Sequence, residues 1–190
     1  IPSERSDFDY TYLIRGVKNL SDEIEKQKQD KVVIIISTVL PGTITRDIKP
    51  LLGNHTKLVY NPFFIAMGST MKDFLHPEFV LFGRDDDKAL KIGKEFYKTI
   101  SNAPIYDTTI ENAELIKVSY NTFISTKIAF INTIMEMCHK LPNTNIDDVS
   151  NALQLGSRRL ISGAYMRGGM GDGGGCHPRD NIALSWLARQ

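Results

Sequence analysis

The chain contains the run Val32-Val-Ile-Ile-Ile36, directly followed by Ser37-Thr-Val-Leu-Pro-Gly-Thr43, and this stretch decides its fold class. Consecutive β-branched residues are typical of a strand that is buried on both faces of a parallel sheet. Pro41-Gly42 is a turn signal that closes the segment. Immediately upstream, apolar residues at helical spacing predict an amphipathic helix over residues 9–28.

Helices and strands continue to alternate downstream of this strand. Such alternation is typical of an α/β fold with a mostly parallel sheet and right-handed crossovers. We therefore predict that residues 1–108 form one α/β domain. Its further elements are strands at 57–60, 79–82 and 105–106 and helices over 44–52 and 85–100.

The pattern changes after Thr109, where one very long helix is predicted. Apolar residues recur at helical spacing for about thirty residues, and no Gly or Pro interrupts them before Pro142. A short helix from Asp147 to Gly156 follows, then a segment with 8 of the chain's 14 glycines, and a final helix that begins near Pro178. We predict an all-α domain over residues 109–190, whose long helix needs a partner surface.

The composition excludes several classes of protein. The chain has 190 residues, 42% of them apolar, and its 23 basic and 22 acidic residues give a net charge of +1. We therefore expect no binding to nucleic acid or to a membrane surface through a basic field. No apolar stretch could span a bilayer and no signal peptide is recognisable, so we expect a cytoplasmic protein. Because the sequence does not begin with Met, we expect a fragment.

The stretch most informative about chemistry is Gly173-Gly-Gly-Cys-His-Pro-Arg-Asp180. A cysteine just ahead of a helix lies in the field of that helix's free N–H groups, which favours the thiolate form. Asp180 lies four residues further on and could accept a proton from a group bound at the sulfur. We therefore favour Cys176 as a nucleophile over a small buried cysteine in a tight turn. Cys138 lies on the apolar stripe of the long helix and is predicted to be a core thiol.

Two other interpretations of this region are disfavoured. The G-x-G-x-x-G pattern at 169–174 follows no convincing strand, so we reject it as a dinucleotide-binding loop. A metal site built from Asp172, Cys176, His177 and Asp180 matches no common zinc spacing, so no metal is expected.

One polar face of the long helix is a second candidate for chemistry. Glu114, Lys117 and Asn121 are spaced so that they share this face. The lysine and the amide could donate hydrogen bonds to an oxygen that develops negative charge. Spacing alone, however, favours an ordinary solvated polar face.

Four segments carry a resemblance to a known family: Ser37–Thr43, Asn61-Pro-Phe-Phe-Ile-Ala-Met-Gly68, Glu114-Leu-Ile-Lys-Val-Ser-Tyr-Asn121 and Gly173–Asp180. Together they resemble the nucleotide-sugar dehydrogenase family, which oxidises UDP-glucose, GDP-mannose and UDP-N-acetylhexosamines to uronic acids. Their order and separations fit this family across nearly the whole chain. The resemblance implies that residues 1–108 are the C-terminal part of a Rossmann-like NAD-binding domain and that residues 109–190 are the central helical domain.

The resemblance also implies catalytic roles. Cys176 matches the cysteine that attacks the aldehyde formed by the first hydride transfer to NAD and that is acylated after the second. Lys117 and Asn121 match the residues that bind substrate and stabilise the oxyanions of these intermediates. Asp180 matches the carboxylate that, with an ordered water, helps to deprotonate the alcohol and to prepare hydrolysis. Thr38 matches the threonine that orders this water beside the cofactor.

Further implied roles concern binding and assembly. Arg179 stands where the family usually has a lysine near the cofactor diphosphate. Tyr165 stands where an aromatic residue contacts the diphosphate of the sugar nucleotide. Gly173 is assigned to substrate binding because it belongs to the glycines that let another molecule approach the backbone closely. The family pairs its long helix with that of a second subunit, so we expect a homodimer.

Two residues depart from the family pattern. Phe63 and Met67 stand where the family normally has glutamates. The second glutamate is tied to cofactor contact and to turnover of the thioester, so Met67 raises the question whether the acid is formed at a normal rate.

The chain also lacks the strand and glycine-rich turn with which the family begins and the second nucleotide-binding domain with which it ends. We therefore expect that this chain alone binds NAD poorly and turns over no sugar nucleotide. Two alternatives stay open at this point. One is a hydroxyacid dehydrogenase in which a long helix with a lysine follows a Rossmann domain, and the other is a non-catalytic dimerisation module.

Overall fold

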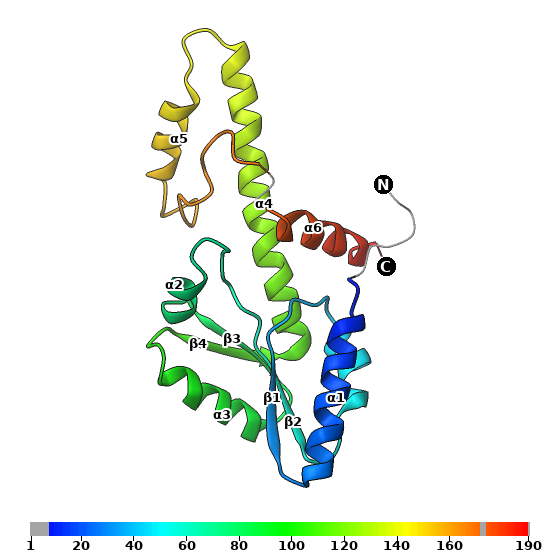
Figure 1. Ribbon diagram of the computed structural model, residues 1–190. Helices are drawn as coiled ribbons and strands as arrows, with labels where there is room; N and C mark the ends of the chain where they lie inside the picture. Colours follow the sequence, from blue (N-terminus) through cyan, green and yellow to red (C-terminus); the bar gives the residue numbers. More distant parts are fainter. Residues whose placement is uncertain (1–7, 172–173, 190) are drawn as a thin grey trace. The chain divides into compact units, whose positions relative to one another are not determined.

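The computed structural model describes residues 8–171 and 174–189. The chain forms two compact units, Ile1–Val118 and Ser119–Gln190 (Figure 1). The long helix α4, Ile110–Lys140, begins in the first unit and continues into the second. No helix in the described part of the chain has the length and apolar character needed to cross a membrane.

The first unit is a four-stranded sheet in the order β1-β2-β3-β4, covered by helices. Its strands are nearly those predicted, and a short helix between β2 and β3 was not foreseen. The elements are α1 (Thr11–Gln27), β1 (Lys31–Ile35), a π-helix η1 (Ile44–Ile48), a 3-10 turn η2 (Lys49–Leu51), β2 (Thr56–Tyr60), α2 (Thr70–Leu75), β3 (Val80–Arg84), α3 (Asp87–Lys98) and β4 (Ile105–Thr109).

The sheet is mixed, with mostly parallel pairing. β1 runs parallel to β2, and β3 runs parallel to β4, but β2 and β3 are antiparallel. The antiparallel pair arises because the segment from Asn61 to Phe79, with α2 in it, leads out of β2 and back into β3 at the same end of the sheet (Figure 1). The prediction of an α/β fold with a mostly parallel sheet is confirmed.

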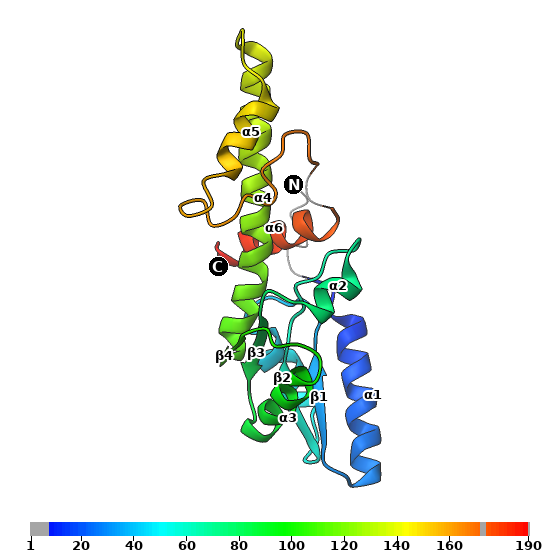
Figure 2. The same cartoon turned by 90° about the vertical axis from the view of Figure 1, so that its left-hand side faces the viewer.

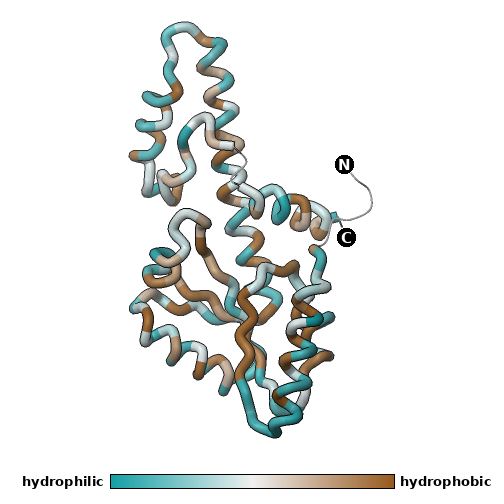
Figure 3. Tube along the Cα trace, in the orientation of Figure 1, coloured by the Kyte–Doolittle hydropathy of each residue, from teal (hydrophilic) through white to brown (hydrophobic). Residues whose placement is uncertain are grey.

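Two apolar cores cover the two faces of this sheet. Side chains alternate between the faces along each strand, so Val33 and Ile35 of β1 belong to the core under α1, while Phe82 of β3 belongs to the core under α3. Figure 2 shows α1 and α3 on opposite sides of the strands. In Figure 3 the strands form the apolar centre of this unit, and α1 alternates between polar and apolar residues. The amphipathic pattern predicted for residues 9–28 is therefore confirmed.

The start of α4 packs very closely onto β3, and Gly83 makes this approach feasible. A Cβ atom at Gly83 would lie 2.9 Å from the Cα of Ile110 and 3.1 Å from the Cβ of Ala113. Both of those residues are buried in the core shared with α1. Because neither neighbour is the end of a flexible side chain, the backbone itself would have to shift to accept a side chain here.

The second unit consists of the rest of α4 together with α5 (Ile146–Gln154) and α6 (Cys176–Leu187). Asn145 caps α5, because its side chain accepts hydrogen bonds from the backbone N–H groups of Asp147 and Asp148. The glycine-rich segment is tied to α4 by Asn132, whose amide donates to the carbonyl of Met170 (2.7 Å) and accepts from the N–H of Gly169 (3.0 Å).

The last helix begins two residues earlier than predicted. Its first residue is Cys176 rather than Pro178, and Gly175 is its N-cap. Pro178 lies at the third helical position, where the missing N–H still costs no helical hydrogen bond. A proline in the first turn therefore marks a helix start only to within a few residues.

We predict that Gly83→Ala destabilises the protein by about 1–3 kcal/mol, because the added methyl group overpacks the contact between β3 and α4. Urea unfolding followed by circular dichroism measures this change. Gly16→Ala is the matched control, since Gly16 lies on the exposed side of α1 and a Cβ there would meet nothing within 4 Å. That variant should gain about 0.5–1 kcal/mol from helix propensity. Equal changes in the two variants would contradict the prediction.

Candidate functional site

The polar face of α4 is buried, contrary to the expectation of a solvated face. Glu114 is 0% exposed, Lys117 6% and Asn121 8%. The spacing of these residues was interpreted correctly, but spacing does not show whether a face is covered by other parts of the fold. Buried polar groups need partners, and each of these three side chains has a partner within its own unit.

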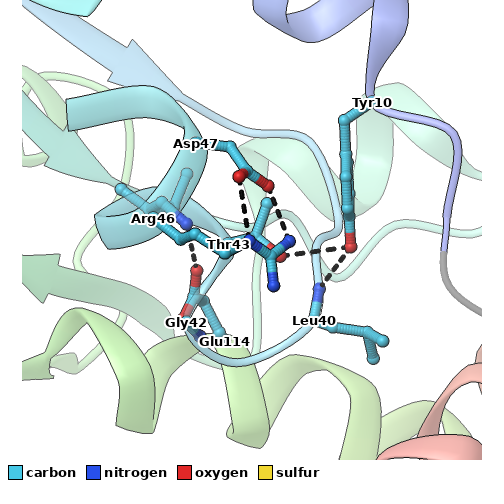
Figure 4. A network of polar contacts seen from close by, with 8 residues as sticks. Tyr10, Leu40, Gly42, Thr43, Arg46, Asp47 and Glu114 are labelled. Carbon is cyan, nitrogen blue, oxygen red and sulfur yellow. Dashed lines mark hydrogen bonds and ion pairs between the residues drawn. The ribbon is translucent and has the colours of Figure 1, made fainter. Parts of the chain in front are cut away.

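The carboxylate of Glu114 accepts two backbone hydrogen bonds from the segment after β1. Gly42 donates to Oε2 (2.6 Å) and Ile44 donates to Oε1 (2.8 Å), as Figure 4 shows for part of this network. Burial raises the pKa of Glu114 to about 7, and this effect outweighs the two hydrogen bonds, which lower it. Glu111 on the same helix raises the pKa further, while Arg46 in η1 lowers it.

The segment between β1 and η1 carries Thr38, which is half-buried. The next two residues, Val39 and Leu40, are buried and fix the segment to the core. The hydroxyl oxygen of Tyr10 accepts hydrogen bonds from the N–H of Leu40 and from the hydroxyl of Thr43, both at 3.2 Å (Figure 4). Thr38 therefore stands at the carboxyl end of a parallel strand, on a segment that is held from both sides.

Lys117 lies one turn after Glu114 on α4. Its ammonium nitrogen is 4.8 Å from the ring centre of Phe64, in the segment that follows β2. This distance is that of a cation–π contact, in which the negative face of the ring faces the charge. The contact places Lys117 beside the segment that contains Phe63 and Met67.

In the second unit, Asn121 and Asp180 bind one another directly. Asn121 Nδ2 donates to Asp180 Oδ2 at 2.6 Å, and the Asp180 side chain is fully buried. Arg179 donates to Asp180 Oδ1 through Nε (3.0 Å) and Nη2 (2.9 Å). The carboxylate thus has three N–H donors, and the Asn121 amide keeps a second N–H for another acceptor.

Cys176 and His177 occupy the first turn of α6. The side chain of Cys176 is exposed, so the alternative of a small buried cysteine is wrong. His177 Nδ1 lies 3.1 Å from the carbonyl oxygen of Asn121, and because a carbonyl only accepts, this nitrogen carries the hydrogen. The contact holds the start of α6 against α4, where Asn121 meets Asp180 one turn further along α6.

The other residues singled out from the sequence are scattered. Tyr165 is half-buried and has φ 62°, a left-handed conformation that is unusual for a residue other than glycine. Gly173, assigned to substrate binding, and Asp172, considered for a metal site, lie outside the described residues. Cys138 is half-buried on α4 rather than fully in the core. Among the described residues, no three His, Cys, Asp or Glu side chains are grouped as metal ligands.

Of the predicted residues, the structure brings Asn121 into direct contact with Asp180, which lies in the helix that begins at Cys176. Thr38 and Lys117 belong to the first unit, whereas Asn121, Cys176 and Asp180 belong to the second. The meeting of Lys117 with Cys176 stays a prediction. Sequence reasoning did not foresee the contacts of Glu114 and His177, although Glu114 was noticed as part of the polar face.

Comparison with known proteins identifies the family. Residues 2–101 match the UDP-glucose/GDP-mannose dehydrogenase family, NAD binding domain, and residues 111–190 match the central domain of the same family. The chain belongs to this family. The two matches lie on either side of the predicted boundary between residues 108 and 109. The assignment favours the nucleotide-sugar dehydrogenase interpretation over a hydroxyacid dehydrogenase.

Individual relatives agree with this assignment. UDP-glucose 6-dehydrogenase of Rickettsia conorii is 33% identical over 181 residues, which are 94% of this chain and 40% of the relative. UDP-glucose 6-dehydrogenase TuaD of Bacillus subtilis is 32% identical over 192 residues, 98% of this chain and 40% of the relative. The chain thus spans two fifths of the length of these dehydrogenases.

Solved structures of the UDP-glucose/GDP-mannose dehydrogenase family share the fold. A UDP-glucose dehydrogenase from the hyperthermophilic archaeon Pyrobaculum islandicum matches with a TM-score of 0.88 and 27% identity, over 99% of this chain and 44% of that one. A GDP-mannose dehydrogenase from Pseudomonas aeruginosa, solved as a ternary complex, matches with a TM-score of 0.77 and 29% identity, over 100% of this chain and 45% of that one.

The raised pKa of Glu114 predicts how stability depends on pH. In the unfolded chain this carboxyl group ionises near its ordinary value of 4.5, whereas the folded pKa is about 7. The folded state therefore holds the extra proton between these values, and its stabilising effect is lost as the pH rises through 7. Relative to Glu114→Gln, the wild type should gain about 1 kcal/mol in free energy of unfolding between pH 8 and pH 6.

Urea unfolding at several pH values measures this difference. Glu111→Gln is the control, because Glu111 lies three residues earlier on α4, is exposed and has a lowered pKa. Its stability should still fall between pH 6 and pH 8, with the fall displaced slightly to lower pH because Glu111 no longer raises the pKa of Glu114. If the free energy of unfolding of Glu114→Gln changed with pH in the same way as that of the wild type, the buried carboxyl group would not titrate between pH 6 and pH 8.

Proposed function

We propose that the protein carrying this chain is an NAD-dependent nucleotide-sugar 6-dehydrogenase. It oxidises the C6 alcohol of a UDP-glucose-like or UDP-N-acetylhexosamine-like substrate to the uronic acid. The proposal rests on family membership and on one arrangement above all. Cys176 is exposed at the first position of a helix, and one turn later the buried Asp180 is held by Asn121 of α4.

The described residues fit an NAD-dependent reaction. Parallel strands of α/β sheets receive nucleotide cofactors at their carboxyl ends, and Thr38 lies just beyond the carboxyl end of β1. Arg179 is half-exposed and offers a cation for the cofactor diphosphate, with part of its guanidinium bound to Asp180. Bound NAD would accept the hydride in each of the two oxidations.

The chain's own residues supply the remaining steps. Asp180, through a water ordered by Thr38, takes the proton of the C6 alcohol as the first hydride leaves and the aldehyde forms. The thiolate of Cys176 attacks the aldehyde carbon and gives the anion of a thiohemiacetal, and loss of a second hydride from this oxyanion leaves a thioester. Water then attacks the thioester carbon and the C–S bond breaks. The acid is released and the thiol of Cys176 is regenerated. Two NAD and one water are consumed for each acid formed.

Lys117 and Asn121 act on the oxygen that carries negative charge in the tetrahedral states. The second N–H of the Asn121 amide is directed by the bond that the first makes to Asp180. Donors that are held before the reaction starts need no reorganisation during it, which is why such fixed dipoles stabilise transition states strongly. Tyr165 and Gly173 are proposed to contact the substrate.

The exposed Met67 predicts slow hydrolysis of the thioester. Met67 is 96% exposed and has no carboxylate to offer to water, while Phe63 packs on Phe74 with ring centres 5.5 Å apart. In a rapid-quench experiment with the complete enzyme, we expect a stoichiometric burst of NADH and an acyl-enzyme that mass spectrometry detects on Cys176. Met67→Glu should shorten the lifetime of this intermediate.

Cys176→Ala is the control, and it should show neither the acyl-enzyme nor acid formation. Unimpaired steady turnover without a burst would rule out slow hydrolysis but would leave the dehydrogenase assignment intact. Full acid formation by the Cys176→Ala variant would refute the proposed mechanism itself.

A homodimer through α4 is also proposed. Phe123, Phe130 and Met137 recur every seven residues along this helix and are 47%, 49% and 50% exposed. A stripe of this kind on one helix face fits the same face of a second copy. Phe130→Glu should therefore shift the protein to monomers in sedimentation velocity, while Glu136→Lys, on another side of α4, should leave the dimer unchanged. A wild type that is monomeric at micromolar concentration would refute the proposal.

A further inference from the structure

Resting on the proposed function, we propose that Glu114 is a positioning residue that fixes Thr38 for proton transfer by holding the segment between β1 and η1 against α4. The residue touches no substrate in this proposal. It acts through the backbone of Gly42 and Ile44, and the argument depends only on contacts within the first unit.

Within the segment, the N–H of Thr43 donates to the carbonyl of Leu40, and that of Arg46 donates to the carbonyl of Gly42. The N–H groups of Gly42 and Ile44 are instead bound by Glu114. Gly42 has φ 89°, a conformation that favours glycine, and its N–H points to the carboxylate instead of to a helical carbonyl. The N–H of Ile44, at the first turn of η1, points to the other carboxylate oxygen. First-turn N–H groups have no partner within their helix, so a side chain must satisfy them when they are buried.

Only a side chain with two acceptor oxygens can serve both donors. Glutamine has nearly the same shape but replaces one oxygen with an NH₂ group, which would face an N–H donor. Because Glu114 is fully buried, water cannot substitute for the lost contact. Glu114→Gln therefore releases one of the two backbone contacts while it keeps the volume of the side chain.

The chain segment that connects the Glu114 contact at Gly42 with Thr38 is short, and its middle residues are buried. Thr38 lies four residues before Gly42, and Val39 and Leu40 between them are buried at 0% and 2% exposure. Tyr10 holds Leu40 and Thr43 from the other side (Figure 4). Thr38 is therefore connected to Gly42 only through this buried pair, and in our proposal loss of the Glu114 contact displaces the pair and Thr38 with it.

Glu114 also stands one turn before Lys117 on α4. The same carboxylate thus connects the helix that carries the proposed oxyanion donor with the segment that carries the proposed water-ordering hydroxyl. Reacting groups from two elements must be held within fractions of an ångström for efficient catalysis. A bidentate contact between the two elements provides this constraint, whereas Glu111, which binds the exposed Thr45 hydroxyl, does not reach the segment before η1.

The test uses steady-state kinetics of the complete enzyme with UDP-glucose, UDP-N-acetylglucosamine, UDP-N-acetylmannosamine and GDP-mannose. Glu114→Gln should lower kcat at least about tenfold and leave KM for NAD and for the sugar nucleotide within about twofold. Glu111→Gln should leave both parameters unchanged. If Glu114→Gln does not fold, Glu114→Asp keeps two oxygens on a shorter arm and should show a smaller loss of kcat.

A double-mutant cycle separates positioning of Thr38 from a general structural effect. If Glu114 acts through Thr38, Glu114→Gln should lower kcat little further in a Thr38→Val background. A kcat equal to that of the wild type, a rise in KM without a change in kcat, or losses that multiply in the double mutant would each overturn the inference.

Amide hydrogen exchange distinguishes failure of this inference from failure of the proposed function. Exchange at Gly42 and Ile44 should be at least about tenfold faster in Glu114→Gln than in the wild type and in Glu111→Gln. No NAD reduction by the wild type with any of the four sugar nucleotides would refute the proposed function and, with it, the positioning role. An active wild type in which Glu114→Gln changes neither kcat nor exchange would refute the present inference alone.

Discussion

Polar side chains that α4 buries must be paired, and this requirement organises both compact units. Glu114 is paired with backbone N–H groups of the segment after β1, Lys117 with the ring of Phe64, and Asn121 with the carboxylate of Asp180. Each pairing fixes a segment that has no regular structure of its own or fixes the start of a helix. Leaving any of these groups without a partner would cost about 1–3 kcal/mol, so the contacts that stabilise each unit also fix the candidate residues within that unit.

The segment after β2 shows how a buried polar anchor and a solvated tip coexist in one loop. The amide of Asn61 donates to the carbonyl of Leu81 (2.7 Å) and accepts from the hydroxyl of Tyr97 (2.5 Å). Burial raises the pKa of Tyr97 to about 12, which keeps this hydroxyl a donor. The base of the loop is therefore fixed by α3 and β3, while Met67 at its tip faces solvent. We therefore expect substitutions of Met67 to have little effect on the hydrogen bonds of Asn61.

Much of the fold could be predicted because its elements have strong patterns. The β-branched run at Val32–Ile36 and the apolar stripes of α1 and α4 are long enough to identify by period. α2 was missed because six residues are too few to show a helical period. The antiparallel pairing of β2 with β3 depends on which end of the sheet a connection leaves, and no local pattern encodes that. For the site, residue types singled out Cys176 and Asp180 as candidates, but burial of the α4 polar face arises from tertiary packing that spacing does not reveal.

The junction between β4 and α4 has no intervening loop, since the strand ends at Thr109 and the helix begins at Ile110. Because Gly83 has no side chain, Ile110 packs directly against β3, and this close contact fixes the position of the first turn of the helix on the sheet. Insertion of one residue at this junction would rotate every later side chain of α4 by about 100°. Glu114 and Lys117 would then face away from the groups they bind. The angular orientation of α4 around its own axis is therefore set by the residue at which β4 ends.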